Sequence, residues 1–253
     1  MIGIFDSGSG GLTVLKAIRE QMPSADSLYF GDIKNAPYGS KSTNELSVLT
    51  VHAIELLQKR GAESIVSACN SVSASLAISL FDALSLAPDH LIEMVGPTVN
   101  SFKNSSARLL LVATPATINS EIYQNAFRMI GKDVAVVAIP DLASSIEFGS
   151  SEEEIETIIR NAFKDVPLNE FDVLILACTH YPLVETIFAR VLPNSITLFD
   201  PAFAVGERVK KQLWPREVGD GTTRFIISTD SQHFRARVAG LLPEGGFSIE
   251  VLD

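Results

Sequence analysis

The two cysteines of the chain stand in the same local pattern, and a thiol can act as a nucleophile, an acid or a base. Cys69 lies in Ala-Cys-Asn-Ser after an apolar run, and Cys178 lies in Ala-Cys-Thr-His after a second apolar run. Each run is typical of a buried strand, and the small polar residues behind each cysteine are typical of a helix start. A thiol at such a junction lies near the positive end of a helix dipole, which favours the thiolate.

Two thiols at equivalent points of two similar units suit a proton transfer that uses both faces of one carbon atom. A racemase or epimerase needs a base on one face and an acid on the other, and a thiolate–thiol pair supplies both. His180, two residues after Cys178, could stabilise that thiolate as a cation or accept its proton. The pattern therefore indicates a two-base enzyme.

Three other interpretations of these residues stay open. Free cysteines are usually inert residues of the core. Cys178 with His180 would also suit a thiol hydrolase, although Cys69 would then have no role. A binding protein on the same scaffold would keep the residues without turnover. The repetition of the pattern, with polar residues after each cysteine, favours the catalytic interpretation.

A glycine-rich turn follows the first apolar run, Ile2 to Phe5. Its sequence, Asp6-Ser7-Gly8-Ser9-Gly10-Gly11, lets backbone N–H groups approach an anion closely. It departs from the dinucleotide-binding fingerprint Gly-x-Gly-x-x-Gly, because Thr13 occupies the last glycine position. We therefore expect a turn that can approach an anion, and not a nucleotide-binding site.

The elements that position these residues alternate between strand and helix along the chain. Strands are expected at 2–5, 27–30, 64–69, 108–113, 134–139, 173–177, 196–199, 224–228 and 247–252. Helices are expected at 12–22, 44–60, 74–80, 98–103, 114–130, 184–192, 202–214 and 232–242, and a further helix begins at 150–154, with 88–93 as a connector and 141–148 ambiguous. This alternation predicts an α/β fold with parallel sheets wrapped by helices, and with ligands at the carboxyl ends of the strands.

The likeness of the two cysteine units predicts two similar parallel-sheet α/β domains that face each other across a cleft. We place the first domain at residues 1–94 plus 204–253, where it carries Asp6 and Cys69. We place the second domain at residues 95–203, where it carries Cys178 and His180.

Composition narrows the classes of function. The 253 residues can bury a substantial core, and a formal charge of −10 disfavours nucleic-acid binding. There is no run of roughly 18 apolar residues, and the start of the chain lacks a basic segment, so we expect no membrane span, no signal peptide and a cytoplasmic location. In that compartment the two cysteines are expected to be free thiols, and the four histidines have no metal-ligand spacing.

Several different short motifs follow one another along the chain. The principal motifs are Asp6-Ser7-Gly8, Gly10-Gly11-Leu12, Gly31-Asp32, Pro37-Tyr38-Gly39, Ala68-Cys69-Asn70 and Ala177-Cys178-Thr179-His180-Tyr181-Pro182-Leu183. Lesser motifs are Ala113-Thr114, Thr117-Ile118 and Ala138-Ile139-Pro140 followed by Glu147. This ordered set resembles the glutamate racemases of the cofactor-independent aspartate/glutamate racemase superfamily, from Ile2 to the region of Phe234.

The resemblance implies both a reaction and a site. The catalytic residues that it implies are Cys69 and Cys178, with Asp6 assisting the first cysteine, His180 assisting the second, and Glu147 as a further assisting acid. The substrate-binding residues that it implies are Asp6, Ser7, Pro37, Tyr38, Gly39, Asn70, Ser71, Thr114, Thr117, Thr179 and His180. The implied reaction interconverts L- and D-glutamate without a cofactor or a metal, and supplies D-glutamate for bacterial peptidoglycan.

Some residues depart from the pattern of that family. Ser71 stands where the family usually has threonine, and the stretch Asp141-Leu142-Ala143-Ser144-Ser145 replaces a more apolar one. Aspartate or another amino acid therefore stays open as an alternative substrate, as does a non-catalytic amino-acid-binding protein on this scaffold. The oligomeric state is also open, with a homodimer among the alternatives.

Overall fold

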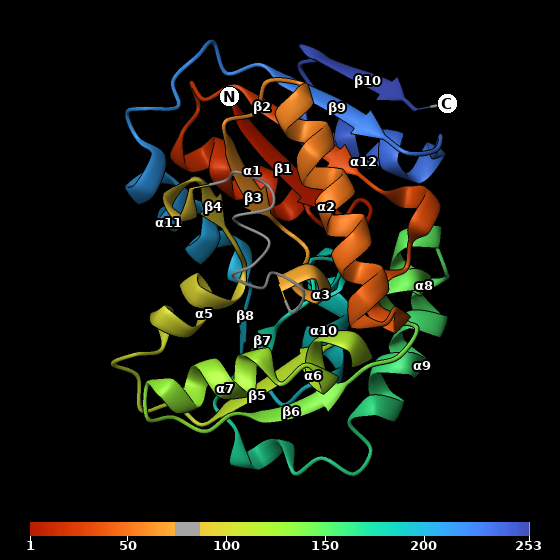
Figure 1. The fold of residues 1–253 in the computed structure, drawn as a ribbon. Helices are drawn as coiled ribbons and strands as arrows, with labels where there is room; N and C mark the ends of the chain where they lie inside the picture. Colours follow the sequence, from red (N-terminus) through yellow and green to blue (C-terminus); the bar gives the residue numbers. More distant parts are fainter. Residues whose placement is uncertain (74–86, 253) are drawn as a thin grey trace.

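Two parallel β-sheets flanked by helices make up the computed structural model, which describes residues 1–73 and 87–252 (Figure 1). The larger sheet has six strands in the order β10-β9-β2-β1-β3-β4, and the smaller sheet has four in the order β6-β5-β7-β8. The α/β fold class with two parallel sheets, which the sequence predicted, is confirmed. None of the helices in the described residues combines the length and the apolar character that crossing a membrane requires.

The strands are short and end in polar segments. The six-stranded sheet comprises β1 (Ile2–Asp6), β2 (Ser27–Gly31), β3 (Ser64–Ser67), β4 (Leu91–Ile92), β9 (Thr223–Ile227) and β10 (Phe247–Val251). The four-stranded sheet comprises β5 (Leu109–Ala113), β6 (Ala135–Ala138), β7 (Val173–Leu176) and β8 (Thr197–Phe199).

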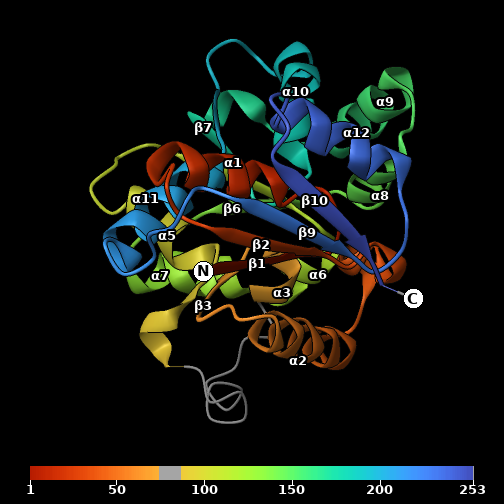
Figure 2. The ribbon, with the colours of Figure 1, turned by 90° about the horizontal axis from the view of Figure 1, so that it is seen from above.

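The helices lie between the strands in the chain and cover the faces of the sheets (Figures 1 and 2). Those before β5 are α1 (Leu12–Gln21), α2 (Thr43–Lys59), α3 (Asn70–Ser73) and α5 (Val95–Ser101). Those between β5 and β8 are α6 (Pro115–Asn119), α7 (Ile122–Met129), α8 (Leu142–Phe148), α9 (Glu152–Ala162) and α10 (Glu185–Val191), and those after β8 are α11 (Pro201–Leu213) and α12 (Gln232–Leu241).

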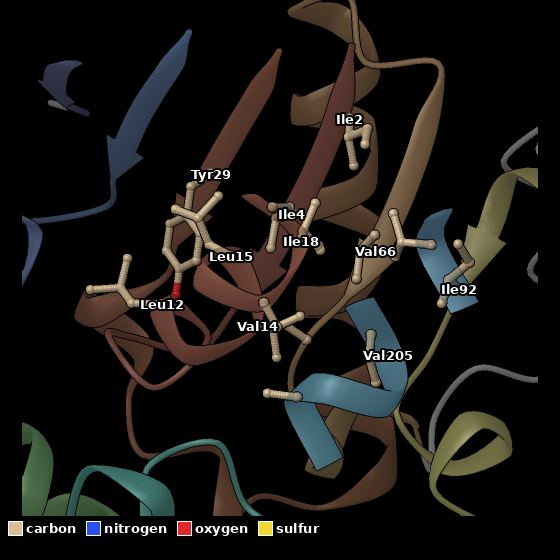
Figure 3. Packing of buried hydrophobic residues seen from close by; sticks show 14 of the residues in the cluster. Ile2, Ile4, Leu12, Val14, Leu15, Ile18, Tyr29, Val66, Ile92 and Val205 are labelled. Atoms are coloured by element: carbon tan, nitrogen blue, oxygen red, sulfur yellow. The ribbon is translucent and has the colours of Figure 1, made fainter. Parts of the chain in front are cut away.

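The central strand of the larger sheet, β1, is buried on both of its faces, as is usual for a parallel strand covered by helices. On one face, Ile2 and Ile4 pack in the apolar layer that includes Val205 of α11 (Figure 3). On the other face, Phe5 packs in a layer that includes Leu57 of α2. Each such fully buried side chain stabilises the fold by about 1.5–3 kcal/mol. This packing fixes the carboxyl end of β1 and the turn that follows it.

The smaller sheet is built on the same alternation. In β5, Leu110 and Val112 belong to one apolar layer, and Leu111 belongs to the opposite layer. The same alternation in β7 places Ala177 in one layer and the next residue, Cys178, in the other, just past the carboxyl end of the strand. Both cysteines therefore follow a strand that apolar packing holds rigidly.

The chain passes between the two sheets twice, and a carboxylate caps the helix after each passage. After β4, Glu93 accepts hydrogen bonds from the N–H groups of Val95 at 2.5 Å and Gly96 at 2.7 Å. After β8, Asp200 accepts one from the N–H group of Ala202 at 2.9 Å. The helices that follow, α5 and α11, contact each other.

The residues that form each sheet can be compared with the predicted domains. The six-stranded sheet takes its strands from residues 2–92 and 223–251, and the four-stranded sheet takes its strands from residues 109–199. The boundaries near 94 and 203 stay a prediction.

Several local elements differ from the sequence-based expectation. Leu91–Ile92 forms strand β4 where a connector was expected, and α5 begins at Val95 rather than at Thr98. The helix expected over 114–130 is divided into α6 and α7, because Glu121 adopts a left-handed backbone with φ of 54°. The ambiguous stretch 141–148 contains α8. The helix expected at 74–80 lies outside the described residues.

Candidate active site

One cavity lies at the carboxyl ends of β3 and β7, and both cysteines line it. The side chain of Cys69 is 5% exposed and that of Cys178 is 6% exposed. The residues that line the cavity are Ser7, Ala36, Pro37, Tyr38, Gly39, Cys69, Asn70, Ser71, Thr114, Ala143, Glu147, Cys178, Thr179 and His180. The two thiols thus come from different sheets and converge on a shared space.

The Cys69 side of the cavity is built on the turn after β1. The thiol of Cys69 donates a weak hydrogen bond to Ser7 Oγ at 3.8 Å. Burial and the charge of Asp6 raise the pKa of Cys69 to about 12, although the hydrogen bonds with the Val72 backbone and with Ser7 act in the opposite direction. Cys69 is therefore a neutral thiol near pH 7.

Asp6 lies next to Ser7 but outside the cavity wall, and it is fully buried. Its carboxylate accepts hydrogen bonds from the Gly8 N–H group at 2.9 Å and from Thr179 Oγ1 at 3.1 Å. Burial raises the pKa of Asp6, while the charge of His180 and the backbone N–H groups lower it. Asp6 connects the turn after β1 to the segment that follows Cys178.

The Cys178 side of the cavity contains a buried row of polar groups. His180 Nδ1 lies 4.0 Å from Cys178 Sγ, and His180 Nε2 lies 2.7 Å from Glu147 Oε2. Burial alone would lower the pKa of His180, but the hydrogen bonds and negative charges of Cys178 and Glu147 raise it to about 10. The imidazole is therefore a cation near pH 7, and it lies beside the sulfur atom of Cys178.

Glu147 anchors this row from α8. Its Oε2 atom accepts hydrogen bonds from the Ser9 N–H group at 3.0 Å, from Ser9 Oγ at 2.5 Å and from Arg237 Nη1 at 3.3 Å. Burial alone would raise the pKa of Glu147, but His180 and Ser9 lower it to about 2.

The sequence motifs did not single out Ser9 or Arg237 as site residues. Ser9 lies inside the glycine-rich turn, which was a usable signal, whereas Arg237 lies far from every motif.

Asn70, Ser71 and Thr114 form a polar wall of the cavity. Ser71 Oγ lies 2.9 Å from Thr114 Oγ1, which in turn lies 3.2 Å from Thr117 Oγ1. Thr117 is fully buried beside Thr114 and does not line the cavity. These hydroxyl groups can donate to or accept from a bound carboxylate.

Two tyrosines hold cavity residues in place. Tyr123 OH donates to Asn70 Oδ1 at 2.6 Å, so the amide Nδ2 group of Asn70 faces away from Tyr123 and has no hydrogen-bond partner among the described residues. Tyr38 OH donates to Asp32 Oδ2 at 2.6 Å. A buried donor without a partner next to a cavity is suited to a ligand that brings an acceptor.

The turn after β1 needs glycine where it packs against Glu147 and Thr179, which belong to the half of the molecule with the four-stranded sheet. A Cβ atom at Gly8 would lie 2.8 Å from the Glu147 carboxyl carbon, and one at Gly10 would lie 2.5 Å from Thr179 Oγ1. These glycines let the turn approach both segments closely. The predicted glycine-rich turn therefore serves as a contact surface between the two halves of the site.

The fold and the site define a class: α/β proteins with two parallel sheets in which a thiol from each sheet faces a shared polar cavity. A sequence model described as Asp/Glu/Hydantoin racemase matches residues 6–207, and the chain belongs to that family. The resemblance stated from the motifs is thereby confirmed.

Curated relatives and solved structures agree with this assignment. The chain is 31% identical to glutamate racemase 1 of Caldanaerobacter subterraneus subsp. tengcongensis over 251 residues, which is 94% of this chain and 91% of that protein. A Bacillus anthracis glutamate racemase superposes with a TM-score of 0.88 at 27% identity, covering 100% of this chain and 97% of the other. A Francisella tularensis glutamate racemase in complex with D-glutamate superposes with a TM-score of 0.86 at 27% identity, with the same coverage.

Proposed function

We propose that the protein is a glutamate racemase, an isomerase that uses Cys69 and Cys178 as the two acid–base groups. The observation that carries this proposal is the convergence of one thiol from each half of the molecule on a single polar cavity. The names of the similar proteins support glutamate as the substrate, as does the D-glutamate bound in the Francisella tularensis structure.

In the proposed reaction, one thiolate removes the α-proton and the other thiol delivers a proton to the opposite face of the carbon. Each turnover moves one proton from substrate to protein and one from protein to product, so the two sulfur atoms exchange protonation states. In one direction of the proposed reaction, Cys178 beside the His180 cation acts as the base, and Cys69 acts as the neutral acid. The opposite enantiomer then runs the same path in reverse.

The polar wall supplies the groups that would hold an amino acid. The free amide N–H of Asn70 and the hydroxyl groups of Ser71 and Thr114 suit the carboxylates. Ser7 and the carboxylate of Asp6 behind it suit the ammonium group. Bonds to the α-carboxylate also stabilise the negative charge that develops when the α-proton leaves.

The test is hydrogen exchange at Cα in heavy water, with D- and L-glutamate, on the wild type and on Cys69→Ser and Cys178→Ser. The wild type is expected to exchange the α-hydrogen and to invert the optical signal of either enantiomer. Each variant is expected to lose about 10²–10⁴-fold in racemisation, because one of the two proton-transfer groups is missing. Full activity after Cys69→Ser would overturn the two-thiol mechanism, and inversion of aspartate in place of glutamate would overturn the substrate.

Four further predictions come with this function. We propose that the product serves peptidoglycan synthesis, that the protein acts in the cytoplasm, and that its partners are small amino acids rather than nucleic acids or membranes. A homodimer stays a prediction, and the molar mass in solution tests it. Depletion of the protein in its host, with and without added D-glutamate, tests the role in the cell wall.

A further inference from the structure

Arg237 of α12 belongs to none of the motifs, yet its guanidinium group reaches the buried end of the Cys178 row. Nη1 lies 3.3 Å from Glu147 Oε2 and also contacts Ser9 Oγ, and Nη2 donates to the carbonyl oxygen of Ile146 at 2.6 Å. The Arg237 side chain is only 25% exposed, so this ion pair is shielded from water more than a surface pair is.

A second contact joins the same two helices. His233 lies four residues before Arg237 on α12, and residues spaced by four share one face of a helix. The His233 ring lies against Gly149 at the end of α8, where an added Cβ atom would stand 2.4 Å from the ring. One face of α12 therefore contacts the C-terminal end of α8.

The planar fork of arginine fits this position. One arm reaches a carboxylate while the other satisfies the Ile146 carbonyl, a division that the single ammonium of lysine does not reproduce. Four contacts converge on Oε2 of Glu147, from the Ser9 backbone, the Ser9 hydroxyl, His180 and Arg237. Oε1 has no partner among the described residues. The carboxylate is thus oriented with Oε2 toward His180.

We propose that Arg237 is a positioning residue for the racemisation proposed above: it holds the Glu147 carboxylate against His180, and through them it sets the reactivity of Cys178. The inference rests on the proposed function for its effect on turnover. Arg237 comes from the segment that covers the six-stranded sheet, and Glu147 comes from the segment that covers the four-stranded sheet. The Cys178 row is therefore complete only when the two halves are packed together.

A double-mutant cycle with Glu147→Gln tests whether Arg237 acts through Glu147. Arg237→Met is expected to lower kcat about tenfold with little change in KM, and Glu147→Gln to lower kcat about 100-fold. The double variant is expected to match Glu147→Gln within about threefold, because the two residues act as one unit. Additive losses, or an Arg237→Met variant within about twofold of the wild type, would overturn the inference.

Two further variants distinguish a positioning role of Arg237 from a general effect on the stability of the protein. Arg237→Lys keeps the charge and is expected to restore part of the kcat that Arg237→Met loses, and it supplies the comparison if Arg237→Met does not fold. Arg235→Met is the matched control, because Arg235 lies on the same helix, is exposed and pairs with Asp230 at 2.7 Å. It is expected to leave kcat unchanged. An equal loss in Arg235→Met would mean that α12 acts only through stability.

A readout without substrate keeps this inference distinct from the proposed function. The alkylation of Cys178 by iodoacetamide at pH 7, located by mass spectrometry, is expected to slow about fivefold in Arg237→Met while that of Cys69 is unchanged. A wild type without glutamate racemisation, but with this selective slowing, would overturn the function and support the inference. Unchanged alkylation of Cys178 would overturn the inference whatever the activity.

Discussion

Cys69 and Cys178 occupy matching positions after parallel strands and have nearly equal exposure, 5% and 6%, yet their charged neighbours differ. Cys69 lies beside Ser7, and burial and the charge of Asp6 raise its pKa. Cys178 lies beside His180, which is paired with Glu147. The shared sequence pattern therefore predicts where the two sulfur atoms lie, and the residues that contact them give each thiol a different electrostatic environment.

In the proposed reaction, this difference favours one direction of proton transfer in the resting protein. A reversible racemase needs one thiol and one thiolate at the start of each turnover, and two identical sites would give no preference between the two arrangements. We propose that the fully buried Asp6 and the buried ion pair of His180 with Glu147 provide that preference. The comparison can be tested on each side of the cavity separately.

The largest expected contrast is in the reactivity of the two thiols. With a pKa of about 12, only about one in 100,000 Cys69 side chains is ionised at pH 7. We expect iodoacetamide to alkylate Cys178 at least ~100-fold faster than Cys69 in the wild type, as followed by peptide mass spectrometry. The equal burial of the two cysteines controls for access, so equal rates would contradict the assigned charges.

Removal of the Glu147 charge is expected to have the next largest effect. Glu147→Gln should lower kcat by about 100-fold, as proposed for the double-mutant cycle, because His180 loses the anion that keeps it protonated.

The His180 pKa is raised, so the contribution of His180 to folding stability is complete below pH 6.5 and is lost as the pH rises through about 10. The Glu147 pKa is lowered, so its contribution is complete above pH 4.5 and is lost as the pH falls through about 2.

The pH dependence of this variant gives the measurement. In the wild type, kcat/KM is expected to stay constant while His180 is a cation, up to about pH 10. In Glu147→Gln, the alkaline decline of kcat/KM should begin at lower pH. Thermal unfolding of both proteins at the same pH values serves as the control for folding. A decline at the same pH in both proteins would show that Glu147 does not hold the proton on His180.

The smallest expected effect concerns Asp6, on the other side of the cavity. The charge of Asp6 raises the pKa of Cys69, and Asp6→Asn removes that charge at nearly constant volume. Alkylation of Cys69 at pH 9 should accelerate about fivefold, while alkylation of Cys178 should change by less than about twofold. Slower alkylation of Cys69 would mean that Asp6 assists the thiolate instead of opposing it.

The sequence predicted the parts of the site that depend on local pattern. The apolar runs before Cys69 and Cys178 determined two strands by their packing alone, and His180 is only two residues from its sulfur partner. Glu147 was found only through the family resemblance, because its partners Ser9 and His180 lie far away in the chain. The roles of all these residues stay predictions.

Other features left too weak a signal in the sequence. Strand β4 has only two residues, Leu91–Ile92, too few for a pattern of alternation. The break between α6 and α7 depends on the left-handed backbone of Glu121, a residue type that usually continues a helix. Arg237 and Tyr123 act across the two halves of the molecule, so only the tertiary fold brings them to the site.

The turn at Gly8 and Gly10 also brings the two halves of the site into direct contact. Bare backbone at these two positions rests directly on the carboxylate of Glu147 and on the hydroxyl of Thr179, with no side chain as a spacer. A methyl group at either position would overlap with these side chains, so they or the turn would have to move. Direct contact between the two halves of the site therefore depends on the absence of side chains at Gly8 and Gly10.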